Sequence, residues 1–145
     1  EGEDALADGR KICRVKYPHD PYDIGGPHQD FWYIEGAEET YTCWAPLTAT
    51  TTDVGGLAIL PGTHRDGPVA HSASDGSRFH GVGDVAADSE WAWSPMQVGD
   101  VLVFHSLTVH SGLPNTSAHV RVSVDYRYQR GGDPMDESHT RPHFE

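Results

Sequence analysis

The chain has 145 residues, enough for one domain with a hydrophobic core of its own. Its formal net charge of −12 argues against a nucleic-acid or anionic-membrane partner, which would favour clustered Lys and Arg. No apolar run approaches the roughly 20 residues of a membrane-spanning helix, and the first residues lack the pattern of a signal peptide.

Short runs of β-branched and aromatic residues alternate with Gly and Pro turns, without the periodicity of long helices. In chain order, this pattern predicts strands within 11–17, 28–36, 40–47, 55–64, 99–112 and 120–129. The segment 65–96 is too long for an ordinary connection, so we expect a functional loop or a lid there. The tail after residue 129 is expected to be loop. Many short strands at similar spacing favour an all-β sandwich or barrel.

The two cysteines, Cys13 and Cys43, are too few for a disulfide scaffold. One disulfide stays open as an alternative, but two buried thiols in a reducing compartment are the favoured interpretation. Together with the acidic composition, this predicts a cytoplasmic protein. The ten histidines equal the number of Lys plus Arg, which makes a metal or acid–base site worth testing.

A candidate metal site begins with His28 and Asp30 in "GGPHQDFWYIEG" (25–36). Alternate side chains of a strand share a face, so these two would project together, with Gln29 on the opposite face. Two histidines and one carboxylate leave adjacent metal positions open, and this set suits non-haem Fe(II) that works with oxygen. Without a third ligand, the pair would be ordinary polar residues at the start of a strand.

Two candidates for the second histidine, His105 and His110, lie in "GDVLVFHSLTVHSG" (99–112). They are five residues apart, so on a regular strand they would point to opposite faces. At most one of them is therefore expected to bind the metal.

The run "VRVSVDYRYQ" (120–129) predicts a strand with two different faces. The alternation places Arg121, Ser123 and Asp125 on one face. We expect the opposite face to belong to the core; it carries Val120, Val122, Val124 and Tyr126. A guanidinium in the middle of a barrel strand binds a carboxylate through its planar fork. That carboxylate would belong either to a ligand or to a structural salt bridge.

Four motifs in this order resemble the phytanoyl-CoA dioxygenase family: the His28-Gln29-Asp30 triplet, "GGLAILPGTHRDG", "GDVLVFHSLTVHSG" and Arg121, eleven residues after His110. The resemblance implies an all-β double-stranded β-helix (a jelly-roll or cupin-like barrel) over about residues 12–129, with flanking helices absent from this chain. It also implies a dioxygenase that uses Fe(II), 2-oxoglutarate and dioxygen. Such an enzyme hydroxylates a C–H bond of a small organic substrate and releases succinate and CO2.

By the same resemblance, His28, Asp30 and His110 are the catalytic metal ligands, because the family's arginine follows its distal histidine by this interval. His105 does not satisfy the interval and is assigned a supporting or structural role. Related halogenases replace the carboxylate with a small residue. The presence of Asp30 therefore favours hydroxylation, with desaturation or cyclisation left open.

The resemblance also assigns cofactor-binding residues. Arg121, helped by Ser123, would anchor the distal carboxylate of 2-oxoglutarate. Trp44 resembles an aromatic residue of the cofactor pocket, with core packing as its alternative role. Candidate substrate contacts, for which packing is again the alternative, are Phe31, Trp32, Tyr33, Arg78, Phe79, Trp91 and Trp93.

We expect residues 1–145 to form a single oxygenase domain in which 65–96 shapes the substrate entrance. The missing initiator Met and flanking helices predict a chain truncated at its N-terminus. Two alternatives remain. One is another metal-dependent jelly-roll enzyme that does not use 2-oxoglutarate, and the other is a non-catalytic domain that binds a metal or a 2-oxo acid.

Overall fold

The computed structural model describes residues 4–20, 26–73, 80–82, 85 and 88–142. Strands predominate, and the helical elements are short: α1 (Phe31–Ile34), η1 (Thr63–Asp66) and η2 (Glu137–Thr140). The strands are β1 (Ala5–Ala7), β2 (Ile12–Lys16), β3 (Thr40–Pro46), β4 (Leu57–Ile59), β5 (His71–Ala73), β6 (His80–Val82), β7 (Leu102–His105), β8 (His110–Gly112) and β9 (Arg121–Arg130). None of the helices in these ranges is long and apolar enough to cross a membrane. The predicted mostly-β class is confirmed.

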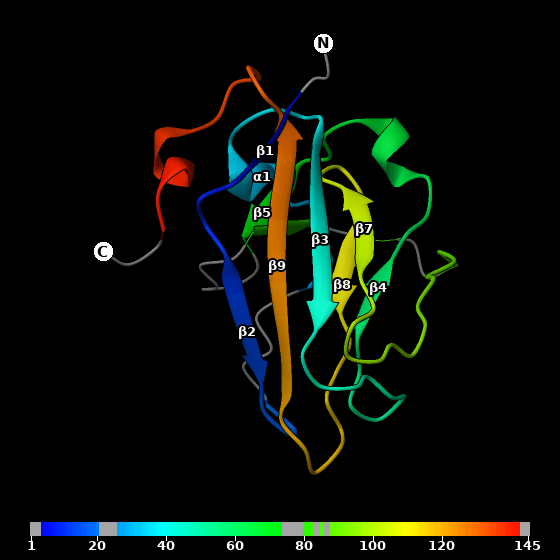
Figure 1. The fold of residues 1–145 in the computed structure, drawn as a ribbon. Helices are drawn as coiled ribbons and strands as arrows, with labels where there is room; N and C mark the ends of the chain where they lie inside the picture. The colour runs from blue at the N-terminus through cyan, green and yellow to red at the C-terminus, as the bar shows by residue number, and fades with distance from the viewer. Residues whose placement is uncertain (1–3, 21–25, 74–79, 83–84, 86–87, 143–145) are drawn as a thin grey trace.

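The long strand β9 is the centre of a five-stranded antiparallel sheet (Figure 1). Along one edge it pairs with β3, where Trp44 lies opposite Asp125 and Thr42 lies opposite Arg127. Along its other edge it pairs with β2 and, closer to its C-terminal end, with β1. Strand β7 extends the sheet beyond β3.

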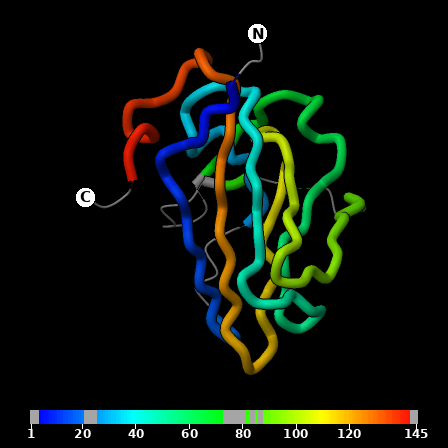
Figure 2. Tube along the Cα trace, in the orientation of Figure 1, coloured from blue at the N-terminus to red at the C-terminus, as the bar shows by residue number. Residues whose placement is uncertain are grey.

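A second, smaller layer contains β4 and β8 and lies behind the large sheet in Figures 1 and 2. His110, the first residue of β8, pairs with Ile59 of β4. On its other side, His110 forms an isolated antiparallel bridge with His28. The second layer therefore places the loop before α1 directly beside β8.

The inner face of β9 is polar, which corrects the prediction that its valine face is core. Arg121, Ser123 and Asp125 are at most 5% exposed, whereas Val120 and Tyr126 are more than a third exposed. The inward polar groups find partners between the layers; for example, Asp125 Oδ2 lies 2.6 Å from Arg14 Nε. The buried apolar side chains belong to elements other than β9: Ile34, Ala37, Trp44, Val54, Ala58, Leu60, Phe104, Leu107 and Val109.

The strand predicted over 28–36 is wrong beyond His28, because the chain turns into α1. The carbonyl of Asp30 accepts backbone hydrogen bonds from Tyr33 and Ile34. Glu35 ends the helix in the left-handed conformation, with φ of 49°. These local hydrogen bonds replace the strand ladder that the alternation predicted.

The run 99–112, predicted as one strand, forms two strands in different sheets. Between β7 and β8 the chain turns, with the Thr108 N–H donating to the His105 carbonyl. Ser106 fixes this turn through its N–H to the Thr40 carbonyl and its hydroxyl to the Glu38 carbonyl. His105 and His110 are therefore not related by strand alternation.

Short elements also occur where loops were expected. β5 and β6 pair within 65–96, and η2 lies in the tail, where His139 Nδ1 is 2.7 Å from Asp8 Oδ2. The cysteines are free, as favoured. The prediction that both are buried is wrong, because Cys13 is exposed and Cys43 only half-buried on the outer side of the sheet.

Candidate metal centre

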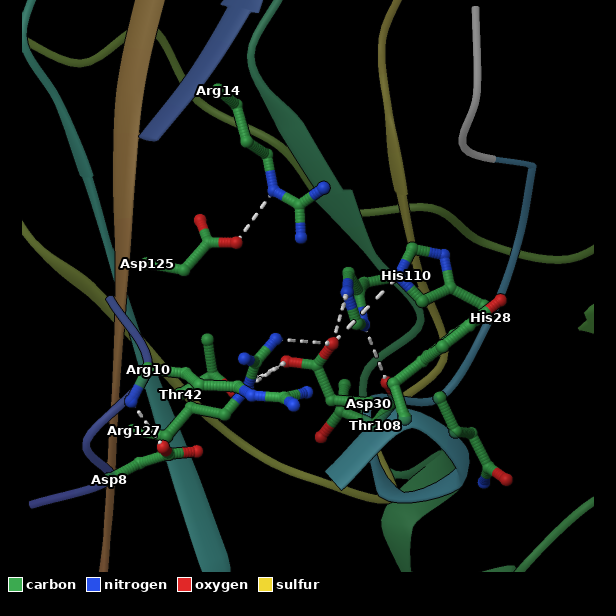
Figure 3. A network of polar contacts seen from close by, with 12 residues as sticks. Asp8, Arg10, Arg14, His28, Asp30, Thr42, Thr108, His110, Asp125 and Arg127 are labelled. Atoms are coloured by element: carbon green, nitrogen blue, oxygen red, sulfur yellow. Dashed lines mark hydrogen bonds and ion pairs between the residues drawn. The ribbon is translucent and has the colours of Figure 1, made fainter. Parts of the chain in front are cut away.

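His28, Asp30 and His110 converge, and each offers one ligand atom to a common point (Figure 3). The three ligand atoms lie within 4.8 Å of one another. Asp30 Oδ1 is 3.9 Å from His28 Nε2 and 3.8 Å from His110 Nε2. In the described part of the chain, this is the only group of three His, Cys, Asp or Glu residues with such a geometry.

Backbone pairing brings the two histidines together. The N–H of each donates to the carbonyl of the other, and both N···O distances are 2.9 Å. Asp30 follows His28 by two residues, at the start of α1, and its carboxylate faces both imidazoles. The sequence prediction that His28 and Asp30 point the same way is therefore correct, although a turn and not a strand produces it.

Backbone carbonyls orient both imidazoles. His28 Nδ1 lies 2.8 Å from the Gly26 carbonyl, and His110 Nδ1 lies 3.0 Å from the Thr108 carbonyl. Because a carbonyl only accepts hydrogen bonds, each Nδ1 carries the proton and each Nε2 presents its lone pair to the site. Two neutral imidazole nitrogens and one carboxylate oxygen match the donor set of non-haem Fe(II). The residues present therefore fit this metal.

Surrounding donors hold Asp30 as a carboxylate. Arg127 Nη2 lies 3.1 Å from Oδ1, while Arg127 Nε lies 3.3 Å and Thr42 Oγ1 2.6 Å from Oδ2. Burial acts to raise the pKa of Asp30. The opposing effects of Arg127, the two histidines and the Thr42 hydroxyl together lower this pKa well below its usual value. The carboxylate is thus ready to bind a cation at neutral pH.

The three residues line a pocket between the two layers that also contains cationic side chains. Its other lining residues are Arg14, Lys16, Thr42, Trp44, Leu57, Phe104, Gly112, Arg121 and Asp125. Lys16 and Arg121 are paired in register on neighbouring strands and are at most 7% exposed. Both donate to the Leu113 carbonyl, at 2.8 Å and 3.4 Å. Two buried cationic side chains therefore line the pocket together with the candidate metal ligands.

The model of the family described as "Phytanoyl-CoA dioxygenase (PhyH)" matches residues 8–123. This stretch contains most of the chain, all three candidate ligands and Arg121. The chain belongs to the phytanoyl-CoA dioxygenase family. The resemblance inferred from the sequence motifs is thereby confirmed.

Individual relatives agree with this membership. The chain is 40% identical to 1-deoxypentalenic acid 11-beta-hydroxylase of Streptomyces arenae over 112 aligned residues, which cover 70% of this chain and 40% of the relative. It thus spans less than half the length of this curated relative.

Among solved structures, the non-heme monooxygenase ThoJ matches with a TM-score of 0.74 and 19% identity, over 92% of this chain and 50% of that one. EvdO2 of Micromonospora carbonacea, complexed with 2-oxoglutarate, matches with a TM-score of 0.72 and 23% identity, over 93% and 57%. At these identities the likeness concerns the fold.

The remaining predicted site residues of this family member lie in different surroundings. Trp44 is 2% exposed and lines the pocket. Ser123 is fully buried beside Arg121 on the inner face of β9, and its hydroxyl has no hydrogen-bond partner among the described residues. His105 lies apart, with Nε2 3.7 Å from Glu39 Oε2 and its ring against Tyr41, so its contacts are structural.

Two residues that contact Asp30, Thr42 and Arg127, are missing from the sequence prediction. The alternation of side chains along β9 and β3 could have indicated both residues. Arg127 continues the polar face of Arg121 by the same two-residue period, and Thr42 shares the inner face of β3 with Trp44. The partner that each would meet could not be inferred, because Asp30 reaches them through a tertiary turn.

The candidate substrate contacts receive little support from the described residues. Trp32 is 44% exposed and donates its indole N–H to the Val69 carbonyl. Tyr33 packs edge-on against the His28 ring, at a centroid distance of 5.5 Å. Phe31, Trp91 and Trp93 are not among the lining residues that the structure describes. Arg78 and Phe79 lie outside the described residues.

Acidification should destabilise the metal-free protein, because His110 is buried in its neutral form. Burial lowers the pKa of His110 to about 4, although the charge of Asp30 acts in the opposite direction. Between pH 6.5 and about pH 4, the unfolded chain binds a proton at His110 that the folded protein does not bind. The free energy of unfolding should therefore fall by up to about 1.4 kcal/mol for each unit of pH lost.

Urea unfolding across this pH range measures the effect, with His110→Gln as the matched variant. The variant should show a shallower dependence on pH. An equal slope in both proteins would mean that other groups cause the acid sensitivity.

Proposed function

We propose that this chain is the oxygenase domain of a non-haem Fe(II)- and 2-oxoglutarate-dependent dioxygenase that hydroxylates a C–H bond of a small organic substrate. The observation that carries the proposal is the shared pocket. The His28–Asp30–His110 ligand atoms and the buried Lys16–Arg121 pair line the same space between the layers. A metal and a dicarboxylate could therefore be bound side by side.

In this proposal His28, Asp30 and His110 hold Fe(II), which leaves the other metal positions for small ligands. When bound, Fe(II) with 2-oxoglutarate and dioxygen supplies the oxidising chemistry, in which the 2-oxo acid becomes succinate and CO2 and the substrate gains a hydroxyl oxygen. The chain contributes ligand orientation. The carbonyls of Gly26 and Thr108 keep each Nε2 aimed at the metal.

Arg121 has the role of anchoring the distal carboxylate of 2-oxoglutarate through its guanidinium fork. Ser123 supports this role, because its buried hydroxyl is available to donate to the same carboxylate. Trp44, Phe104 and Leu57 supply apolar surface to the pocket, which limits the access of water.

Several finer features belong to the same proposal. The two layers would be parts of a double-stranded β-helix, a single oxygenase domain in which 65–96 shapes the substrate entrance. Hydroxylation is favoured over halogenation because Asp30 keeps its carboxylate, and a relative is named as a hydroxylase. The acidic composition and free thiols support a cytoplasmic location and a small-molecule substrate in place of nucleic acid or membrane.

Anaerobic reconstitution with Fe(II) and 2-oxoglutarate tests the proposal. A chelate of both at this site should produce a weak visible charge-transfer band that saturates at one equivalent of each. The band should be lost in Asp30→Ala. A folded protein that binds Fe(II) without a band on addition of 2-oxoglutarate would instead indicate a metal enzyme that does not use this cosubstrate. A folded protein that binds no metal would favour a non-catalytic domain.

A further inference from the structure

We propose that Arg127, together with Thr42, is a positioning residue that fixes Asp30 as a ligand through one oxygen only. The inference rests on the proposed function, since it concerns the same metal. Arg127 contacts neither the Nε2 atoms of His28 and His110 nor, in this proposal, the substrate. It would act through the carboxylate of Asp30.

The two oxygens of Asp30 have different surroundings. Oδ2 accepts from Thr42 Oγ1 at 2.6 Å and from Arg127 Nε at 3.3 Å. Oδ1 accepts from Arg127 Nη2 at 3.1 Å and faces both histidine Nε2 atoms, at 3.9 Å and 3.8 Å. Two donors therefore occupy the lone pairs of Oδ2, while Oδ1 keeps a lone pair toward the histidines. Figure 3 shows the guanidinium and the imidazoles on opposite sides of the carboxylate.

The strands fix these donors independently of any ligand. Thr42 and Arg127 are directly paired on β3 and β9. Their exposed fractions are 1% and 3%, and that of Asp30 is 2%. Water cannot readily replace a lost donor at this depth, so removing either one would leave a buried oxygen without its hydrogen bond. The geometry is thus a rigid clamp and not a surface ion pair.

The clamp has a consequence for the metal. If Asp30 turned to bind through both oxygens, the carboxylate would occupy a position that a further ligand needs. With one oxygen from Asp30 and one nitrogen from each histidine, a six-coordinate metal keeps three positions. That number suits the two donor atoms of a 2-oxo acid and dioxygen. Arg127 also neutralises the carboxylate, so the metal keeps more of its positive charge toward an incoming anion.

A second guanidinium–carboxylate pair at the end of the same strand supplies the control. Arg130 Nη2 lies 3.1 Å from Asp133 Oδ1, and neither residue lines the pocket or belongs to the candidate ligand set. Arg130→Met removes the same group as Arg127→Met, from the same strand, without touching Asp30.

Anaerobic titration with Co(II) tests the clamp, because the visible absorption of Co(II) reports its coordination as well as its affinity. Arg127→Met should weaken Co(II) binding by about 10- to 100-fold and alter the spectrum. Thr42→Val, which is nearly isosteric, should weaken binding several-fold, and Arg127→Lys should fall between Arg127→Met and wild type. Arg130→Met should stay within about twofold of wild type, with an unchanged spectrum.

A double variant separates positioning from general damage. In an Asp30→Ala background, Arg127→Met should cost no further Co(II) affinity, because its effect passes through Asp30. The clamp would be overturned if wild type and Arg127→Met had the same Co(II) affinity and the same spectrum. If Arg127→Met does not fold, the comparison of wild type with Thr42→Val decides. Failure of the folded wild type to bind Co(II) would instead overturn the proposed metal site.

Discussion

Substitution of His110 by Ala should abolish metal binding, whereas substitution of His105 by Ala should leave it intact. His110 Nε2 lies 3.8 Å from Asp30 Oδ1, and its Nδ1 is held by the Thr108 carbonyl. Without this imidazole, two ligands remain, and we expect Fe(II) or Mn(II) affinity to fall by more than about 100-fold. The His105 imidazole contacts Glu39 and Tyr41 instead, on the far side of β7.

Isothermal titration with Mn(II) under identical conditions measures both variants. His105→Ala is the matched control because it removes the same side chain five residues away. The His105→Ala affinity should stay within about threefold of wild type, since its contacts lie outside the ligand set. The opposite pattern would assign the third ligand to His105 and reject the geometry described here.

Sequence reasoning selected three candidate ligands that the fold brings together, because the motif order carried more information than the local structure. The alternation argument placed His28 and Asp30 on one side of a strand, yet His28 forms only an isolated bridge and the chain then turns into α1. Hydrogen bonds from Tyr33 and Ile34 to the Asp30 carbonyl form a turn that a two-residue period cannot represent. The correct pairing of the two side chains thus came from a wrong local structure.

The same limit explains the run 99–112. Its apolar character predicts a strand, but the break at Ser106 depends on hydrogen bonds to the Glu38 and Thr40 carbonyls, which are far away in the sequence. The choice between His105 and His110 required knowledge of that break. The family interval to Arg121 selected His110, the histidine that lies beside His28 and Asp30, where strand geometry could not choose.

The faces of β9 show where a general rule failed. The hydrophobicity of Val122 and Val124 predicted that their face is core, and the guanidinium on the opposite face predicted a ligand site or a structural salt bridge. The inner face is polar because Arg121 and Asp125 line the pocket, Asp125 meets Arg14, and Arg127 meets Asp30. Alternation along the strand was predictable, but the assignment of inside and outside depended on the presence of the pocket.

Substitution of Arg121 by Met should weaken 2-oxoglutarate binding strongly while metal affinity is retained. Arg121 is 5% exposed and donates to the carbonyls of Gly56 and Leu113, so its guanidinium is already fixed in the pocket. A carboxylate that loses a buried guanidinium partner typically loses a few kcal/mol, so the dissociation constant should rise by about 100-fold. Arg121 is not among the metal ligands, and Mn(II) affinity should change less than about threefold.

Titration of the Fe(II)-loaded protein with 2-oxoglutarate, followed by the charge-transfer band, measures this loss. Arg130→Met, on the same strand but with a half-exposed side chain paired to Asp133, is the matched control. Arg121→Lys should bind 2-oxoglutarate more weakly than wild type but more tightly than Arg121→Met, because it keeps the charge and loses the fork. If folded Arg121→Met kept the 2-oxoglutarate affinity of wild type, Arg121 would not be the anchor. Lys16, the other buried cation of the pocket, would then be the candidate, and Lys16→Met should lose 2-oxoglutarate affinity.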